Sequence, residues 1–442
     1  MRVLMVQTPS VESFTQERVY PIGIVTLATY LKQAGHEVEV LDMNLAVDQF
    51  GALKEKILDF LPQLVGLSLR NIDPLANKTS SLIPPFVVTA RMVKALLPES
   101  WIVAGGTGFS LFPERIMAEV REIDYGIVGE GERSFPMLLE NLVNPRPLPG
   151  LCLRLGDGLK INPPTGDFEM ANYIVPCREV LSPELYKSIN NYVPTLGIET
   201  KRGCPLNCAY CVYPKLQGRK LRSRPAEAVV DELESLHKEY GVRDFHFNDP
   251  VVNILPGHLE TICREILRRK LQVTWTGFFR ENLLDGENVR LYEASGCSCF
   301  SFSPDGLSQE SLDVLGKNLT EADILRAGKL TSQTNVCTMY HFMVNVPGEN
   351  AKTIAKGLEL VDRLYEMHEV NRNLGTVVLN NIRILPGTPI EVLARKQGVI
   401  KADTDLLYPT YYNPSPYETL RYRLETYHLQ RNVFMWQKVR SS

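Results

Sequence analysis

The stretch TLGIETKRGCPLNCAYCVYP (Thr195–Pro214) leads from a short apolar run into a segment with three cysteines. Cys204, Cys208 and Cys211 are spaced C-x3-C-x2-C. A glycine and a proline flank the first cysteine, and both favour a loop over the middle of a helix. The stretch therefore predicts a strand followed at once by a cysteine-bearing loop.

The spacing favours an iron–sulfur cluster. A redox pair would leave one cysteine unexplained, and zinc would want a fourth thiolate or a histidine nearby in sequence. Three thiolates on a loop suit a cubane cluster that keeps one iron free of protein. Another metal, or small residues packed on one helix face, remain alternatives from spacing alone.

Composition limits the class of protein. The chain has 442 residues, which indicates two or three domains, and 44% hydrophobic with 22% charged residues is typical of a globular protein. A net charge of -3 provides no basic field for nucleic acid. The N-terminal apolar run is too short for a signal peptide, and no later run reaches membrane-spanning length. We expect a cytoplasmic protein without membrane association, whose nine cysteines form no disulfide framework.

The first 144 residues alternate short apolar runs with segments of helical period. This pattern predicts a parallel sheet covered on both faces, in a doubly wound, Rossmann-like domain. The predicted strands are 3–6, 38–41, 64–69, 101–104 and 125–128. Residues 145–191 are rich in turn signals and are expected to form a linker with a small hairpin.

The alternation resumes over residues 192–402. Six strand–helix units predict a partial (β/α)6 TIM-type barrel, with ligands at the carboxyl ends of its strands. The predicted strands are 195–200, 244–248, 272–279, 299–303, 338–346 and 379–385, and the predicted helices are 226–240, 258–269, 288–294, 321–333 and 351–367. Residues 403–442 are expected to form an aromatic-rich, then helical, tail.

The cysteine loop, with an aromatic residue (Tyr210) before its last cysteine, resembles that of the radical S-adenosylmethionine superfamily. Four later stretches resemble strand ends of that family in the same order: FHFNDP (245–250), FFRENLL (278–284), VNVPGEN (344–350) and RILPGTPI (383–390). Turn chemistry alone explains the Pro-Gly pair in each of the last two stretches, but it does not explain why all four stretches occur in the family's order.

The resemblance implies a [4Fe-4S] cluster on Cys204, Cys208 and Cys211, whose open iron binds S-adenosylmethionine. One-electron reduction, by a donor such as flavodoxin or ferredoxin, would cleave a carbon–sulfur bond of this cofactor. Further cofactor-binding residues are implied by the matched strand ends, with an aspartate in place of the usual glutamate after the fourth strand: Tyr210, Asn248, Asp249, Arg280, Asp305 and Glu349.

The N-terminal domain resembles the cobalamin-binding domain of one large branch of this superfamily. The matching blocks are residues 21–42, 101–117 and 123–142. Glycines after a strand would let a bulky ligand approach the backbone, and VGEGE (Val128–Glu132) opens the next turn. The implied cofactor-binding residues are Gly105, Gly106, Gly108 and Glu130.

Two departures from the family pattern matter. Asn44 stands where histidine-ligated cobalamin proteins carry the histidine of a D-x-H-x-x-G motif. Cobalamin would then be bound without a histidine ligand to cobalt, or the domain would be vestigial and serve packing or substrate binding. Cys297 and Cys299 are either extra ligands or, as we expect, small buried residues; Cys337 is expected to be structural. His246 and His341 could face the barrel cavity.

The resemblance implies an enzyme that transfers a group derived from S-adenosylmethionine to a small molecule, with methyl transfer through cobalamin favoured. One alternative is cobalamin-independent transfer of a 3-amino-3-carboxypropyl group to arsenic, as in the arsinothricin-pathway enzyme, whose domain plan is weakly similar. Another is a non-catalytic iron–sulfur or corrinoid carrier or sensor. A basic run at Lys215–Arg224 is the one feature that would favour RNA as substrate.

Overall fold

The computed structural model describes residues 1–10, 18–74, 80–156, 158–186, 194 and 196–414. The chain forms two compact units. One comprises Met1–Leu196 with 215–218 and 407–409, and the other comprises Gly197–Pro214, Arg219–Leu406 and the residues from Thr410 on. Most of the expected C-terminal tail and the first residue of the strand at 195–200 lie outside the described residues.

The first unit is built on one seven-stranded sheet of order β2-β1-β3-β4-β5-β6-β7. Its first five strands are parallel, and the last two are antiparallel. Neighbours of β1 on either side are β2 and β3, so the chain changes direction there, where doubly wound folds bind ligands. The strands are β1 (Arg2–Gln7), β2 (Glu37–Asp42), β3 (Leu64–Ser68), β4 (Trp101–Gly105), β5 (Tyr125–Ile127), β6 (Leu151–Leu155) and β7 (Gly158–Ile161).

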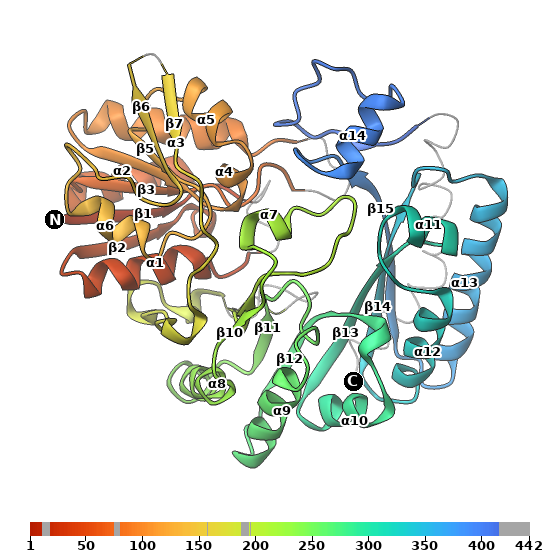
Figure 1. The fold of residues 1–442 in the computed structure, drawn as a ribbon. Coiled ribbons are helices and arrows are strands. Elements are labelled where there is room, and N and C mark those ends of the chain that lie inside the picture. The colour runs from red at the N-terminus through yellow and green to blue at the C-terminus, as the bar shows by residue number, and fades with distance from the viewer. Residues whose placement is uncertain (11–17, 75–79, 157, 187–193, 195, 415–442) are drawn as a thin grey trace. The chain divides into compact units, whose positions relative to one another are not determined.

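Helices cover this sheet on both faces, which confirms the doubly wound fold. Helix α1 packs beside α6, and α2 packs beside α3 on the opposite face (Figure 1). The helices are α1 (Ile22–Gln33), α2 (Gln49–Phe60), α3 (Ile83–Leu96), α4 (Thr107–Leu111), α5 (Pro113–Glu119) and α6 (Ser134–Leu139), with short 3-10 turns η1 (Met43–Leu45), η2 (Met170–Asn172), η3 (Arg178–Val180) and η4 (Pro183–Tyr186).

The described part of segment 145–191 packs within the first unit. Its hairpin, β6–β7, continues the sheet. Beyond the hairpin, the Tyr20 hydroxyl donates to the Leu181 carbonyl (2.8 Å), and the Tyr186 hydroxyl donates to the Asp42 carboxylate (2.5 Å). Long-range hydrogen bonds of this kind fix a segment that has almost no regular secondary structure.

The second unit is a curled sheet of order β16-β15-β14-β13-β12-β11-β8. Strands β11 to β15 run parallel, β16 is antiparallel, and the sheet ends at β16 and β8 without closing, so the barrel is partial as predicted. The strands are β8 (Leu196–Ile198), β11 (Asp244–Phe247), β12 (Thr274–Phe279), β13 (Cys297–Asp305), β14 (Cys337–Val344), β15 (Leu374–Arg383) and β16 (Tyr411–Tyr412), with a separate ribbon of β9 (Lys201–Arg202) and β10 (Arg222–Ser223).

Helices lie along the outer face of this curled sheet (Figure 1). Three of them begin with reciprocal capping boxes, at Asp285, Thr320 and Asn350, which satisfy the first free N–H groups. The helices are α7 (Tyr213–Gln217), α8 (Ala226–Tyr240), α9 (His258–Arg268), α10 (Gly286–Ala294), α11 (Gln309–Val314), α12 (Glu321–Thr331), α13 (Ala351–Glu369) and α14 (Pro389–Lys396), with the 3-10 turn η5 (Glu281–Leu283). In the part of the chain that the structure describes, no helix is both long and apolar enough to cross a bilayer.

Successive side chains along these strands point alternately to the outer face, which packs against the helices, and to the inner face of the curled sheet. Phe302 packs on Tyr340, and Tyr340 contacts His368 of α13, so these side chains face the helices. The opposite face carries His246 and His341, whose rings lie 6.0 and 5.7 Å from that of Phe278. Some side chains on this inner face, including His246, Phe278 and His341, are half-exposed, whereas the side chains that face the helices are buried.

A buried histidine makes the second unit sensitive to acid. His368 is fully buried between the Tyr340 hydroxyl (3.2 Å) and the Asn373 amide oxygen (2.7 Å). Burial lowers the pKa of His368 to about 4. Between that value and the ordinary 6.5, the unfolded chain binds a proton that the folded chain does not. Its contribution is therefore complete above pH 6.5 and is lost as the pH falls toward 4.

We expect this residue to cost about 3 kcal/mol of unfolding free energy between pH 6.5 and 4. Urea denaturation at a series of pH values would measure it. His368→Gln should reduce the slope of unfolding free energy against pH by one proton, relative to the unmodified protein measured in parallel. An unaltered slope in His368→Gln would contradict the assignment.

Candidate functional site

The cysteine loop begins at a turn that only glycine fits. Gly203 has φ +93°, and a Cβ there would lie 2.1 Å from the carbonyl oxygen of Lys220. This turn lets the chain leave the β9–β10 ribbon and place Cys204 in a buried position. Cys208 and Cys211 are half-exposed on the same loop.

Backbone contacts hold the loop from two sides. The Ala209 N–H donates to the Leu315 carbonyl (2.8 Å), and the Ala209 carbonyl accepts from the Ile390 N–H (3.0 Å). A Cβ at Gly316 would lie only 2.9 Å from the Asn207 oxygen. The loop is thus fixed by segments that follow β13 and β15, at the carboxyl ends of the strands.

The thiol chemistry of this loop suits a cluster rather than a single metal ion. Among the residues that the structure describes, no three or more His, Cys, Asp or Glu side chains gather closely enough to hold one ion. Burial raises the pKa of the Cys204 thiol and raises that of Cys211 to about 12. The positive charge of bound iron would instead stabilise the deprotonated thiolates. Three sulfur donors without a fourth fit a cubane with one open iron.

Asp249 supports the start of the loop. Its Oδ1 accepts from the backbone N–H of Thr200 (2.9 Å) and Lys201 (3.1 Å), and its Oδ2 accepts from the Thr200 hydroxyl (2.5 Å). The Lys201 ammonium completes the set with an ion pair of 2.6 Å and also donates to the Val252 carbonyl. Both charged side chains are almost fully buried. The predicted cofactor residue Asp249 thus already has four donors within the protein.

A second charged network links the loop to the end of β13. Tyr210 donates a short hydrogen bond to Asp305, and the Lys317 ammonium pairs with the same carboxylate oxygen at 2.6 Å. Asp305 has φ +63°, at a shift in the β13–β14 register. Such backbone conformations in non-glycine residues concentrate at functional sites.

Burial and charge set the protonation of this network. Burial, followed by the Asp305 carboxylate, raises the pKa of Tyr210, so the phenol stays protonated and donates. Burial alone would lower the pKa of Lys317, but the surrounding acidic groups, Asp305 first, outweigh burial and raise it. The site therefore contains a charged ammonium close to the cysteine loop.

Arg280 holds the backbone of Lys317 in position. Its guanidinium donates to the carbonyls of Lys317 (2.5 Å) and Asn318 (2.9 Å). The Arg280 backbone is in turn held by the Asn253 side chain. Sequence reasoning identified Arg280 but missed Lys317 and Lys201, because nothing in the local sequence of either lysine indicates which strand end it reaches.

The other two predicted residues of this unit follow the carboxyl ends of two parallel strands, β11 and β14, which β12 and β13 separate in the sheet. Asn248 follows β11 and packs over Gly197, where a Cβ would lie 2.0 Å from the amide nitrogen. Glu349 accepts a hydrogen bond from the Asn345 N–H (2.6 Å), and burial raises the pKa of Glu349 to about 7. Both therefore belong to the same edge of the sheet as the cysteine loop.

In the first unit, the glycines after β4 serve close backbone packing. A Cβ at Gly106, which has φ +100°, would lie 2.6 Å from the Leu69 carbonyl oxygen, and one at Gly108 would lie 2.9 Å from it. A Cβ at Gly105 would make only an ordinary contact. Two of the three glycines thus bring this turn against the segment after β3.

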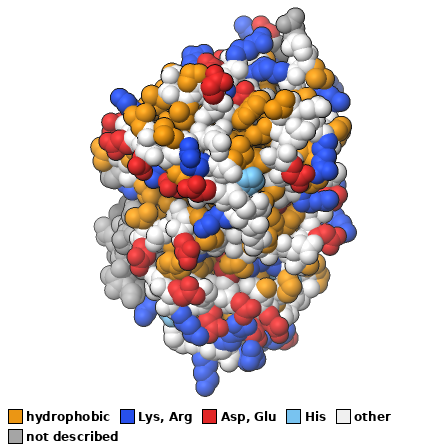
Figure 2. All heavy atoms as spheres, turned by 90° about the vertical axis from the view of Figure 1, so that its left-hand side faces the viewer, with side chains coloured by type: hydrophobic (Ala, Val, Ile, Leu, Met, Phe, Trp, Pro, Cys, Tyr) orange, Lys and Arg blue, Asp and Glu red, His pale blue; other side chains and the backbone are white. Residues whose placement is uncertain are grey.

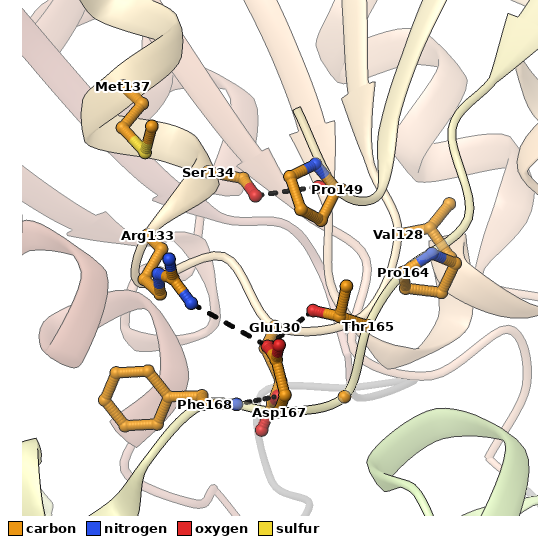
Figure 3. A pocket seen from close by; sticks show the side chains of 11 residues that line it. Val128, Glu130, Arg133, Ser134, Met137, Pro149, Pro164, Thr165, Asp167 and Phe168 are labelled. Carbon is orange, nitrogen blue, oxygen red and sulfur yellow. Dashed lines mark hydrogen bonds and ion pairs between the residues drawn. The ribbon is translucent and has the colours of Figure 1, made fainter. Parts of the chain in front are cut away.

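Glu130 lines a small cavity of about 60 Å³ in the first unit (Figure 3). Its carboxylate accepts from the Phe168 N–H (3.1 Å), and Arg133 lies 3.9 Å from Asp167 across the opening. The cavity is closed on one side by segment 164–168. A cavity of this size holds only a few water molecules, far fewer atoms than a corrin.

Asn44, at the position of the absent histidine, is buried and occupied by structural hydrogen bonds. Its Oδ1 accepts from the Ser10 N–H (2.8 Å), and its Nδ2 donates to Asp42 (2.7 Å). Burial raises the pKa of Asp42, although the Tyr186 hydroxyl and Asn44 both stabilise its charged form. Asn44 therefore offers no nitrogen ligand to a metal.

The buried Lys201–Asp249 pair gives a direct test of what supports the loop. We expect Lys201→Met and Asp249→Asn each to lower the unfolding free energy by about 3–5 kcal/mol, because each leaves one buried group uncompensated. The double variant should lose less than the sum of the two. Urea denaturation measures all three, with Lys356→Met, from the exposed pair with Glu310, as a control that changes little. Additive losses would show that the two side chains do not interact.

Comparison with known proteins agrees with this geometry. Residues 15–139 match the family described as "B12 binding domain", and residues 198–361 match the "Radical SAM superfamily". An uncharacterized methyltransferase of Pyrococcus horikoshii is 27% identical over 373 residues, covering 82% of this chain and 78% of the relative. The tryptophan 2-C-methyltransferase of Streptomyces laurentii is 27% identical over 419 residues, covering 79% of this chain and 68% of the relative.

The fold also has a solved counterpart. TsrM from Kitasatospora setae, a radical S-adenosylmethionine methyltransferase solved with cobalamin and a [4Fe-4S] cluster, aligns with 91% of this chain and 76% of its own. The TM-score is 0.75 and the identity 24%. A radical SAM domain implies a [4Fe-4S] cluster and S-adenosylmethionine as cofactors. The chain thus carries an N-terminal B12 binding domain followed by a domain of the radical SAM superfamily.

Proposed function

We propose that this protein is a cobalamin-dependent methyltransferase that acts on a small molecule at the carboxyl ends of the barrel strands. The observation that carries the proposal is the cysteine loop tied to a buried Tyr210–Asp305–Lys317 network at one strand edge. Two relatives that align with about four fifths of this chain are methyltransferases by name, which supports methyl transfer.

The cluster would supply one electron to the sulfonium of S-adenosylmethionine, and cobalamin would supply the methyl carrier. The chain's own residues bind and orient. Cys204, Cys208 and Cys211 would hold three irons and leave the fourth for the methionine amine and carboxylate. The Lys317 ammonium, which lies beside Tyr210 of the loop, would bind that carboxylate, and Tyr210 would border the adenine.

The remaining strand ends would complete the cofactor site. Arg280 fixes the position of Lys317 through its backbone carbonyl, and Asp249 fixes the loop start through Thr200 and Lys201. Asn248 and Glu349 would face the cofactor from β11 and β14. In the first unit, the turns at Gly105–Gly108 and Glu130 would border cobalamin, with Asn44 leaving cobalt without a histidine ligand.

A small-molecule substrate fits the inner face of the barrel. Half-exposed polar and apolar side chains alternate there, among them His246, His341 and Met343. On the face drawn in Figure 2, acidic and basic side chains are interspersed with apolar ones, without a broad basic area of the kind that RNA requires. We place the reaction in the cytoplasm, with a flavodoxin or ferredoxin as electron donor.

Product analysis tests the reaction. With S-adenosylmethionine, a reductant and cobalamin, we expect the anaerobically reconstituted enzyme to release 5′-deoxyadenosine or S-adenosylhomocysteine. The triple variant Cys204→Ala/Cys208→Ala/Cys211→Ala should release neither, because it has no cluster ligands. Methylthioadenosine would instead indicate transfer of the aminocarboxypropyl group. Absorption bands of a corrin in the purified protein would support cobalamin, and their absence after reconstitution would overturn that part.

Lys317 offers a sharper test of the cofactor site. Lys317→Met should raise the KM for S-adenosylmethionine at least tenfold, since about 1.5–3 kcal/mol is typical of a charged hydrogen bond. Lys329→Met, an exposed lysine of α12, serves as the matched control. Iron content should remain that of the unmodified enzyme. Loss of iron with an unchanged KM would assign Lys317 to the cluster loop instead.

A further inference from the structure

Two cysteines lie side by side on neighbouring strands, away from the cysteine loop. Cys299 of β13 and Cys337 of β14 are paired residues in the parallel register. Neighbouring strands are about 4.8 Å apart, which lies within the Cα separation that a disulfide spans. Sequence reasoning treated both as structural because they are 38 positions apart and share no motif.

Both thiols lie on the inner face of the curled sheet. Phe300 and Tyr340, which pack toward the helices, have the opposite parity on the same two strands. Cys299 and Cys337 are half-exposed, whereas Cys297 is buried. The side chains of this pair are therefore not completely enclosed, in contrast to Cys297.

The surroundings pack closely against Cys337 and give Cys299 a polar neighbour. A Cβ at Gly375 of β15 would lie 2.4 Å from the Cys337 sulfur, so only glycine tolerates this side chain beside it. The Cys299 sulfur also lies 3.7 Å from the Ser301 hydroxyl. The hydrogen bond from Cys337 is the largest cause that lowers the pKa of Cys299 below its ordinary value. Cys299 is thus the better nucleophile of the two.

The pair is separate from the cluster ligands. Cys299 stands near the start of β13, while Asp305, which contacts Tyr210 of the cysteine loop, ends it. Six residues of strand separate the two by about 20 Å at 3.3 Å per residue. The pair therefore has no part in holding the cluster.

We propose that Cys299 and Cys337 form a redox-sensitive dithiol that a small disulfide such as oxidised glutathione converts reversibly to a disulfide between β13 and β14. The Cys299 thiolate attacks one sulfur of glutathione disulfide, forms a mixed disulfide and releases one glutathione thiolate. The Cys337 thiolate then attacks the Cys299 sulfur and releases the second glutathione. Two electrons and two protons pass from the pair to the oxidant, which becomes two glutathione thiols.

Reversibility follows from the sheet geometry. Side chains stand upright on a sheet, so the two Cβ atoms are separated by about the strand spacing of 4.8 Å. A relaxed disulfide prefers about 3.8 Å between Cβ atoms. The bridge would hold the strands under strain, and strained disulfides are the more easily reduced ones. The proposal does not depend on methyl transfer.

Peptide mapping of the holoenzyme tests the proposal. The anaerobic, cluster-loaded protein is equilibrated with defined ratios of reduced to oxidised glutathione, quenched in acid, unfolded, alkylated and digested with trypsin. Cys297 and Cys299 then lie in peptide 291–317, and Cys337 lies alone in peptide 330–352. Fragment ions that break at Ser298 separate the first two cysteines.

We expect a 291–317/330–352 cross-link through Cys299, with Cys297 alkylated, and its disappearance when excess reduced glutathione is added. Buried Cys152 and Cys263 should remain alkylated throughout. A cross-link through Cys297, or full alkylation of both residues at every ratio, would overturn the proposal. Cys337→Ser should trap glutathione on Cys299 at least tenfold more than the unmodified chain does, with Cys152→Ser as control. If Cys337→Ser does not fold, the map of the unmodified protein decides alone.

Discussion

The buried carboxylate of Asp249 is the constraint on which the candidate active site depends. It accepts four hydrogen bonds from Thr200 and Lys201, which shortly precede the glycine turn of the cysteine loop. A charge buried this completely is stable only when its partners are in place, because desolvation costs several kcal/mol. The end of β8 and the end of β11 are therefore fixed to each other, and the loop leaves the sheet in one direction.

The positions of the two buried ion pairs distinguish the pair that supports the cysteine loop from the pair that lies at the candidate site. Lys201 and Asp249 satisfy each other inside the protein, whereas Lys317 and Asp305 lie at the strand edge with Tyr210 beside them. Arg280 contributes by holding backbone carbonyls, so its charge fixes geometry. A site built in this way positions a cofactor before it binds, which limits the ordering that binding itself must bring about.

In the first unit, a glycine beside a strand end can serve either to admit a ligand or to admit neighbouring backbone. Glycines after β4 were expected to admit a ligand, and the structure shows that Gly106 and Gly108 admit the neighbouring backbone near Leu69. Asn44 in place of histidine is part of a buried network with Asp42 and Ser10. Its hydrogen bonds give a physical reason why this chain keeps an asparagine there.

Most of the fold was predictable because strand and helix periods are local. Apolar runs and helical repeats within a dozen residues specify both sheets, and C-x3-C-x2-C specifies the cysteine loop. Partners distant in sequence were not predictable: Lys201 with Asp249, 48 positions apart, Tyr210 with Asp305, 95 apart, and Cys299 with Cys337. The sequence by itself determined the domain types and the thiols of the cluster loop. Only the tertiary structure decided which charges and thiols meet, because strand order and register bring them together.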